Sequence, residues 1–162
     1  MKTTEISELL GIPMIEVGKI LGINDFTIIE NLKTPAEARE LYKVCPDTMR
    51  PAVVKKWEEL AIPNLKTPAE ARELYYVCHN TMNAAVLKKW EELVIPNLKT
   101  PAEARELYKV CPDTMRPAVL KKWEELVQKA IPNLKTPAEA QELYKVCPDI
   151  MRPAVVKRMV EL

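Results

Sequence analysis

Cysteine and histidine are the side chains of this chain that could act as nucleophiles or metal ligands. The cysteines are Cys45, Cys78, Cys111 and Cys147. The single histidine, His79, directly follows Cys78. Thiolate catalysis needs a base beside the sulfur and a third group that orients the base. The sequence does not supply such a base and orienting group for the cysteines. We therefore expect no catalytic residue, no metal and no cofactor, and we interpret the cysteines as small buried hydrophobic residues.

Composition excludes further classes of site. The chain has only three glycines, Gly11, Gly18 and Gly22, and none belongs to a glycine-rich phosphate loop. Its 24 basic and 23 acidic residues give a net charge of +1, so no global field attracts nucleic acid or an acidic membrane. No stretch reads as a signal peptide or a membrane span, and we expect a cytoplasmic protein without membrane contact.

An internal repeat organises the chain. The dipeptide Thr-Pro begins at residues 34, 67, 100 and 136, so the spacings are 33, 33 and 36 residues. Segments 33–60 and 99–126 agree at 27 of 28 positions. We expect one domain over 1–162 that consists of a divergent N-terminal cap and four near-identical repeats, over 1–30, 31–63, 64–96, 97–132 and 133–162.

Each repeat is predicted to be a helix, a tight turn, a second helix and a linker. In the first repeat Thr34 is the expected N-cap, Pro35 is the first helical residue, and Glu37 at the third helical position completes a capping box. Pro46 ends this helix. Asp47 is the expected N-cap of the second helix. In the third repeat the additional residues 128–130 should lengthen the second helix by nearly one turn.

Apolar side chains recur at helical spacing in both predicted helices. The first helix carries Ala38, Leu41, Val44 and Cys45. The second carries Met49, Val53, Val54, Trp57, Leu60 and Ala61. Neither helix can bury such a stripe alone, so neighbouring repeats must stack on one another. The expected fold is an all-α solenoid of two-helix repeats of about 33 residues.

The repeat resembles known helical repeats at Thr34-Pro35-x-Glu37, Leu41 and Pro46-Asp47-x-Met49-Arg50-x-Ala52-Val53. It is similar to the HEAT-like repeats and to the leucine-rich-repeat-variant pattern over about 20 residues of each copy. The resemblance implies a right-handed superhelix whose second helices line a concave face. It also implies protein binding as the usual role.

Aspartate and arginine occur together in three of the four repeats and are lost together in the second. They are predicted to form a structural ladder of Asp–Arg pairs, because a lone charge between stacked repeats would be costly. The pairs are Asp47 with Arg50, Asp113 with Arg116, and Asp149 with Arg152. The second repeat has Asn80 and Asn83 instead.

Two sets of residues are candidates for binding a partner. The first is the cluster of differences in the second repeat, namely Tyr76, His79, Asn80 and Asn83. The second is a pair of lysine stripes on the second helices, formed by Lys55, Lys56, Lys88, Lys89, Lys121 and Lys122. A parallel stripe of glutamates opposes nucleic-acid binding and makes a solvated surface an alternative.

The two ends of the chain suggest further alternatives. Residues 5–21 look like a helix-turn-helix, but Lys19 is the one basic residue of its predicted recognition helix. A cap repeat accounts for the same residues, and we prefer that interpretation. At the other end Met159 and Val160 replace Trp-Glu and could mediate a homodimer. The leading expectation is a non-enzymatic scaffold for an unknown protein or peptide. Nucleic-acid binding through the lysine stripes and an architectural, self-assembling role are the alternatives.

Overall fold

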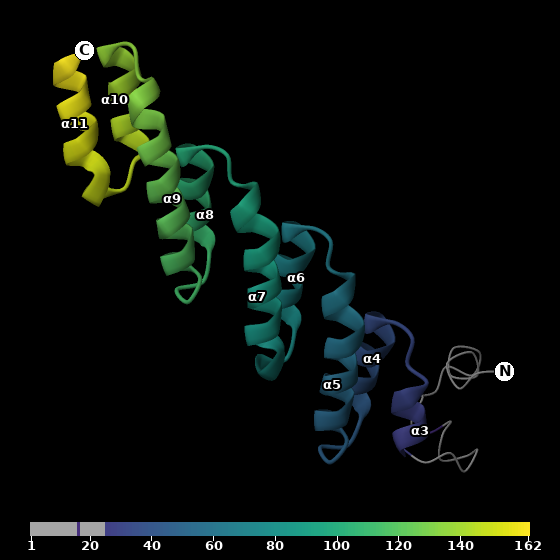
Figure 1. Cartoon of the computed structure of the whole chain (residues 1–162). Coiled ribbons are helices and arrows are strands. Elements are labelled where there is room, and N and C mark those ends of the chain that lie inside the picture. Colours follow the sequence, from purple (N-terminus) through teal and green to yellow (C-terminus); the bar gives the residue numbers. More distant parts are fainter. Residues whose placement is uncertain (1–15, 17–24) are drawn as a thin grey trace. The chain divides into compact units, whose positions relative to one another are not determined.

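The computed structural model describes Glu16 and residues 25–162, and within this part every regular element is helical. The all-α prediction is therefore confirmed for the described residues. The helix-turn-helix-like stretch and most of the predicted cap lie outside them. Figure 1 shows α3 (Asp25–Glu30), α4 (Pro35–Val44), α5 (Arg50–Ala61), α6 (Pro68–Val77), α7 (Asn83–Val94), α8 (Pro101–Val110), α9 (Arg116–Ala130), α10 (Pro137–Val146) and α11 (Arg152–Glu161).

Short 3-10 helices complete the repeats. Three of them contain the linker sequence Ile-Pro-Asn and follow a second helix: η1 (Ile62–Asn64), η3 (Ile95–Asn97) and η4 (Ile131–Asn133). Two others lie in the turn before a second helix: η2 (Asn80–Met82) and η5 (Asp149–Met151). The linker proline has no N–H to donate to the preceding turn, so the second helix ends at the linker.

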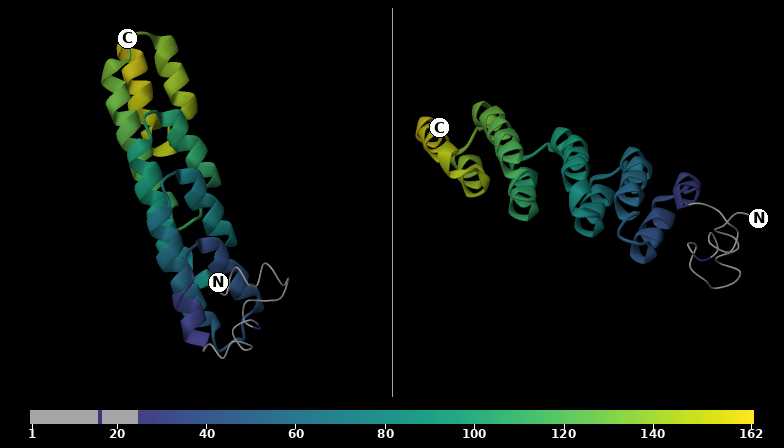
Figure 2. Two further views of the ribbon diagram at one scale, coloured as in Figure 1. Left: turned by 90° about the vertical axis from the view of Figure 1, so that its right-hand side faces the viewer. Right: turned by 90° about the horizontal axis from the view of Figure 1, so that it is seen from below.

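The chain packs as two compact units, residues 1–89 and 90–162, and the division falls inside α7. The sequence analysis expected one domain over the whole chain. In the first unit α4 packs on α5, and α3 also contacts α5. In the second unit α8 packs on α9, α10 packs on α11, and α8 contacts α10. Figure 2 shows these helix pairs from two further directions.

The first helix of every repeat begins with the predicted capping box. In the first repeat Thr34 Oγ1 accepts a hydrogen bond from Glu37 N at 3.2 Å. The Glu37 carboxylate in turn accepts from the backbone N–H of Lys33 at 2.7 Å and of Thr34 at 3.1 Å. The same arrangement is present at Thr67, Thr100 and Thr136. These contacts satisfy N–H groups that have no partner inside the helix.

The predicted N-cap role of Asp47 is wrong. Helix α5 begins at Arg50 and is preceded by Met49, which makes no side-chain cap. Backbone hydrogen bonds close the turn instead, with Met49 N donating to Pro46 O at 2.9 Å. The Asp47 carboxylate pairs with Arg50 Nη1 at 2.8 Å and is therefore not used as a cap.

The core follows the predicted stripes, except that Leu60 is only partly buried and Val44 is exposed. Ala38, Leu41 and Cys45 of the first repeat are buried, as are Val53 and Trp57 of the second helix. Val44 was predicted to be buried but is 50% exposed. At 100° per residue Val44 lies about 60° around the helix from Leu41, on the side away from Ala38, and so outside the packed face.

The three additional residues of the third repeat lengthen its second helix as predicted. Helix α9 has 15 residues, whereas α5 has 12. Linker η4 follows directly, and Asn133 Nδ2 donates to Lys129 O at 2.9 Å. Asn64 makes the equivalent bond to Leu60 O at 2.7 Å in the first repeat. The linker is thus attached to the helix end in the same way despite the insertion.

Candidate binding grooves between consecutive repeats

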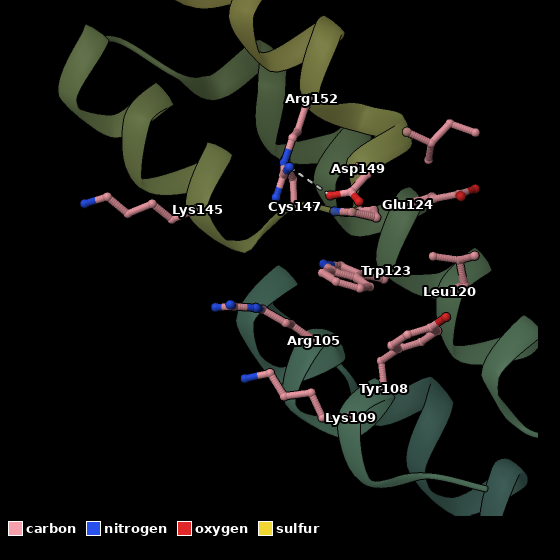
Figure 3. Close-up of a pocket in the computed structure, with 12 residues that line it drawn as sticks. Arg105, Tyr108, Lys109, Leu120, Trp123, Glu124, Lys145, Cys147, Asp149 and Arg152 are labelled. Atoms are coloured by element: carbon pink, nitrogen blue, oxygen red, sulfur yellow. Dashed lines mark ion pairs between the residues drawn. The ribbon is translucent and has the colours of Figure 1, made fainter. Parts of the chain in front are cut away.

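A groove of about 450 Å³ lies between the third and fourth repeats, and we call it groove B (Figure 3). Its first wall comes from the third repeat and includes Arg105, Tyr108, Lys109, Leu120, Trp123 and Glu124. Its second wall comes from the start of the fourth repeat and includes Lys145, Cys147, Pro148, Asp149, Ile150 and Arg152. The volume falls in the range of about 300–1,000 Å³ that is usual for ligand sites.

An equivalent groove, groove A, lies between the first and second repeats in the other unit. It consists of two adjoining cavities of about 540 and 360 Å³ that share Tyr42 and His79. Its first wall carries the counterparts of the groove B residues, namely Arg39, Tyr42, Lys43, Val54, Trp57 and Glu58. The same wall also includes Asp47, Arg50, Pro51 and Lys55, whose counterparts do not line groove B. Its second wall carries Val77, Cys78, His79, Asn80 and Thr81. Each unit therefore presents the same kind of groove, made by one repeat and the turn of the next.

The tyrosine of the first wall is held in place by the Asp–Arg pair of its own repeat. In the first repeat the Arg50 guanidinium lies 5.5 Å from the centre of the Tyr42 ring, a cation–π distance. Arg50 also pairs with Asp47. Arg116 on Tyr108 and Arg152 on Tyr144 repeat the contact at 5.6 and 5.2 Å.

The predicted Asp–Arg pairs thus lie inside single repeats, three residues apart, on side chains that are exposed. Asp113 pairs with Arg116 at 2.8 Å, and Asp149 pairs with Arg152 at 3.0 Å. The aspartates are nearly nine-tenths exposed. The prediction that the pairs are buried between stacked repeats is therefore wrong. Exposed pairs of this kind contribute about 0–1 kcal/mol each.

Trp123 joins the two repeats that form groove B. Its indole Nε1 donates to the backbone oxygen of Val146, the last residue of α10, at 2.9 Å. The last carbonyl groups of a helix have no partner inside the helix, so this tryptophan satisfies one of them. Its ring also lies 5.7 Å from the Tyr108 ring. The tryptophan predicted to be a core residue is therefore also a wall of the groove.

The residues that distinguish the second repeat gather at groove A. The His79 ring meets the edge of the Tyr42 ring at 5.5 Å. Its Nδ1 accepts from Thr81 N at 3.3 Å, so His79 caps the short helix η2. Asn80 also lines the groove. Asn83 does not; its Oδ1 accepts from the Cys78 thiol at 3.1 Å.

Tyr76 lies on α6 and is the most exposed aromatic residue of the second repeat, at 61%. Its ring stands edge-to-face with Tyr75 at 5.5 Å. The equivalent position of the fourth repeat is Lys145, which lines groove B. Tyr76 therefore belongs to the helix that carries the second wall of groove A.

The predicted lysine stripes contribute little to the grooves. Lys55 lines groove A. The other members of the stripes, Lys56, Lys88, Lys89, Lys121 and Lys122, are not among the lining residues of either groove. The first helices contribute Arg39 and Lys43 to groove A and their counterparts Arg105 and Lys109 to groove B, and Arg50 of α5 also lines groove A.

Sequence reasoning missed this first wall because it treated Tyr42 as the flank of a core stripe and Trp57 as core alone. A signal was nevertheless present. Arginine occupies positions 39, 72 and 105 and tryptophan positions 57, 90 and 123, whereas the fourth repeat has Gln141 and Met159. Joint replacement of two residues from different helices indicates that they share a surface.

The four cysteines are packing residues, and two of them, Cys78 and Cys147, also line the grooves. None forms a disulfide, and three are buried while Cys78 is partly exposed. Burial raises the pKa of all four thiols above its ordinary value. A raised pKa keeps the thiol protonated and poorly nucleophilic.

The last helix exposes apolar side chains. Val160 is 81% exposed, and Met159 beside it is half-buried. Ile150, Val156 and Leu162 are further exposed apolar residues of this repeat. The predicted self-association residues thus lie on a largely uncovered surface of α11.

The part of the chain that the structure describes has neither a cluster of metal ligands nor a helix that could span a membrane. Within residue 16 and 25–162, no three or more His, Cys, Asp or Glu side chains gather where they could hold a metal ion. No helix of the described part is long and apolar enough to cross a bilayer.

Comparisons with protein-family models, curated proteins and solved structures gave no match for the chain. The likeness to HEAT-like repeats accordingly stays a prediction.

Proposed function

We propose that the chain is a non-enzymatic interaction scaffold, an α-solenoid of repeats of about 33 residues that binds proteins through the grooves between consecutive repeats. The observation that carries the proposal is the recurrence of one groove in both compact units, with matching first walls. These walls consist of tyrosine, tryptophan and arginine, the residue types that dominate binding energy at protein interfaces.

The chemistry of the grooves supports binding more than catalysis. The thiols that line them, Cys78 and Cys147, have raised pKa values, and their charged groups form exposed ion pairs. The aromatic rings and the arginine beside them offer a flat apolar contact and several N–H donors, which suit a peptide side chain and its backbone carbonyls. We also propose a cytoplasmic location, which unpaired cysteines favour.

A display selection tests the proposed function. Random 12-residue peptides would be selected on the full chain, and the enriched peptides titrated into ¹⁵N-labelled protein. We expect the peptides to shift the Trp123 indole resonance and the amides around Tyr42 or Tyr108. The variant Lys121→Glu, on an exposed face outside both grooves, should bind as the wild type does. Failure to enrich any peptide, or shifts confined to other surfaces, refutes the proposal.

A second candidate function is self-association through α11, which its exposed apolar residues favour. Val160 occupies the position of Glu58, Glu91 and Glu124 in the other repeats. Val160→Glu therefore restores a residue that the repeat already accepts. We expect the wild type to dimerise with rising concentration in sedimentation velocity and the variant to stay monomeric. A monomeric wild type at several hundred micromolar contradicts this candidate.

A further inference from the structure

Grooves A and B have equivalent residues on their first walls, but their second walls differ in charge. In groove B the second wall carries Lys145, Asp149 and Arg152. The equivalent residues of the second repeat are Tyr76, Asn80 and Asn83, all without charge. The turn of the following repeat thus determines how the two grooves differ.

The charges around groove B favour an anionic ligand. Four basic side chains line it, Arg105, Lys109, Lys145 and Arg152, against the two acidic side chains Glu124 and Asp149. Asp149 is already engaged by Arg152 at 3.0 Å. Arg105 has no ion-pair partner among the residues that the structure describes, so its guanidinium offers a fork of N–H donors to a carboxylate.

The two lysines of groove B can also turn to a ligand. Lys109 bonds Glu106 at 2.6 Å, and Lys145 bonds Glu142 at 2.5 Å. Neither glutamate lines the groove, and all four side chains are at least half exposed. Such pairs are worth only about 0–1 kcal/mol, so a bound carboxylate can replace the glutamate at little cost.

Figure 3 shows how the cations lie relative to the apolar surface. Arg105 and Lys109 from α8 and Lys145 from α10 extend along one edge of groove B. Trp123 lies between the two walls, with Tyr108 and Leu120 beside it. An apolar side chain can rest on these rings while a neighbouring carboxylate meets the cations.

We propose that groove B is specific for an acidic segment of a partner protein, in which a glutamate or aspartate adjoins an apolar residue. Groove A also has four basic side chains, Arg39, Lys43, Arg50 and Lys55, but all of them belong to its first wall. Groove B has basic side chains on both walls, so we assign the acidic requirement to groove B. This inference rests on the proposed function and adds the chemistry of the partner. Lys145 and Arg152 are the residues that set the specificity.

The test uses the full chain and three fluorescein-labelled 12-residue probes: four copies of Glu-Leu-Ser, the same with Gln for Glu, and the same with Lys for Glu. Binding is measured by fluorescence anisotropy at 50 and 300 mM NaCl. We expect the Glu probe to bind at least tenfold tighter than the Gln probe at low salt, and this preference to shrink at high salt.

The chain itself supplies matched variants, since each repeat already tolerates the residues of the other. The triple variant Lys145→Tyr, Asp149→Asn and Arg152→Asn gives groove B the uncharged residues that the second repeat has at these three positions. We expect it to bind the Glu probe about tenfold more weakly, as the loss of two charged donors implies, with binding of the Gln probe unchanged. Its circular dichroism spectrum and melting temperature establish that the repeat still folds.

The reciprocal variant tests the same idea by gain of function. Tyr76→Lys, Asn80→Asp and Asn83→Arg give groove A a charged second wall. We expect a second site for the Glu probe, seen as a doubled stoichiometry. The control Lys121→Glu changes net charge by the same sign as the triple variant but lies outside groove B, and it should leave the affinity unchanged.

The outcomes separate the two proposals. Equal affinity for the Glu and Gln probes, or a Lys121→Glu effect as large as that of the triple variant, overturns the acidic specificity and leaves the scaffold standing. Absence of binding by every probe and by every display-selected peptide overturns the scaffold itself. A 12-nucleotide oligouridine that binds tighter than the Glu probe, and loses affinity in the triple variant, reassigns groove B to nucleic acid and refutes the inference.

Discussion

The hydrogen bond from Trp123 to Val146 gives a quantitative test of how consecutive repeats adhere. Trp123→Phe keeps an aromatic ring but removes the Nε1–H that reaches the end of α10. A hydrogen bond contributes about 0.5–1.5 kcal/mol, and leaving its acceptor without a partner raises the cost to about 1–3 kcal/mol. Trp57→Phe is the matched control, because the Trp57 ring packs on Tyr42 at 6.2 Å and its indole makes no hydrogen bond to a described residue.

Both variants lose the same ring area and keep two tryptophans, so the difference between them isolates the bond. We expect Trp123→Phe to lower the free energy of unfolding by about 1–1.5 kcal/mol more than Trp57→Phe. With a urea m value of about 2 kcal/mol/M, this is a difference of about 0.6 M in the midpoint. Urea denaturation followed by circular dichroism at 222 nm measures it. Midpoints within 0.1 M of each other would refute the reasoning.

Three further outcomes follow from the described contacts. Backbone N–H groups that donate to the carboxylates of Glu70 and Glu103 hold the pKa of both groups below its usual value. The two carboxylates therefore stabilise the folded state fully above about pH 5, and this contribution is lost as the pH falls through the folded-state pKa. The melting temperature of the double variant Glu70→Gln/Glu103→Gln should consequently fall less from pH 5 to pH 3 than that of the wild type. Removing an N-cap through Thr100→Ala should cost about 1 kcal/mol in urea denaturation, whereas Thr114→Ala, in an exposed turn, should cost little. Ellman's reagent should modify the partly exposed Cys78 first and the three buried cysteines only on unfolding, and four equal rates would contradict this.

Much of the fold was predictable because its signals are local. The capping box at Thr34 depends on a residue three positions away, and the stripe of Ala38, Leu41 and Cys45 depends on helical spacing alone. The misassigned residues have competing uses that a pattern does not reveal. Asp47 pairs with Arg50 instead of capping a helix, and Val44 lies just beyond the packed face.

The grooves were harder to anticipate because each is formed by two repeats. Tyr108 and Lys145 lie on different helices, and only packing brings them to one cavity. Sequence comparison between repeats did identify His79 and Asn80, since a difference among near-identical copies is visible without knowledge of the fold. It did not identify Arg105, because the replacement of this arginine by Gln141 in the fourth repeat was not considered together with the replacement of tryptophan by Met159.

The helix caps have a consequence for how such a chain can change in length. Every contact that starts a first helix joins residues no more than four positions apart, from Lys33–Glu37 onwards. The Asn that fastens each linker also reaches back only four residues. Recombination between two Lys-Thr-Pro sequences therefore adds or removes a whole module and leaves every remaining helix with its own start and end. The number of repeats can therefore change by unequal crossing-over without disturbing the caps of the helices that remain.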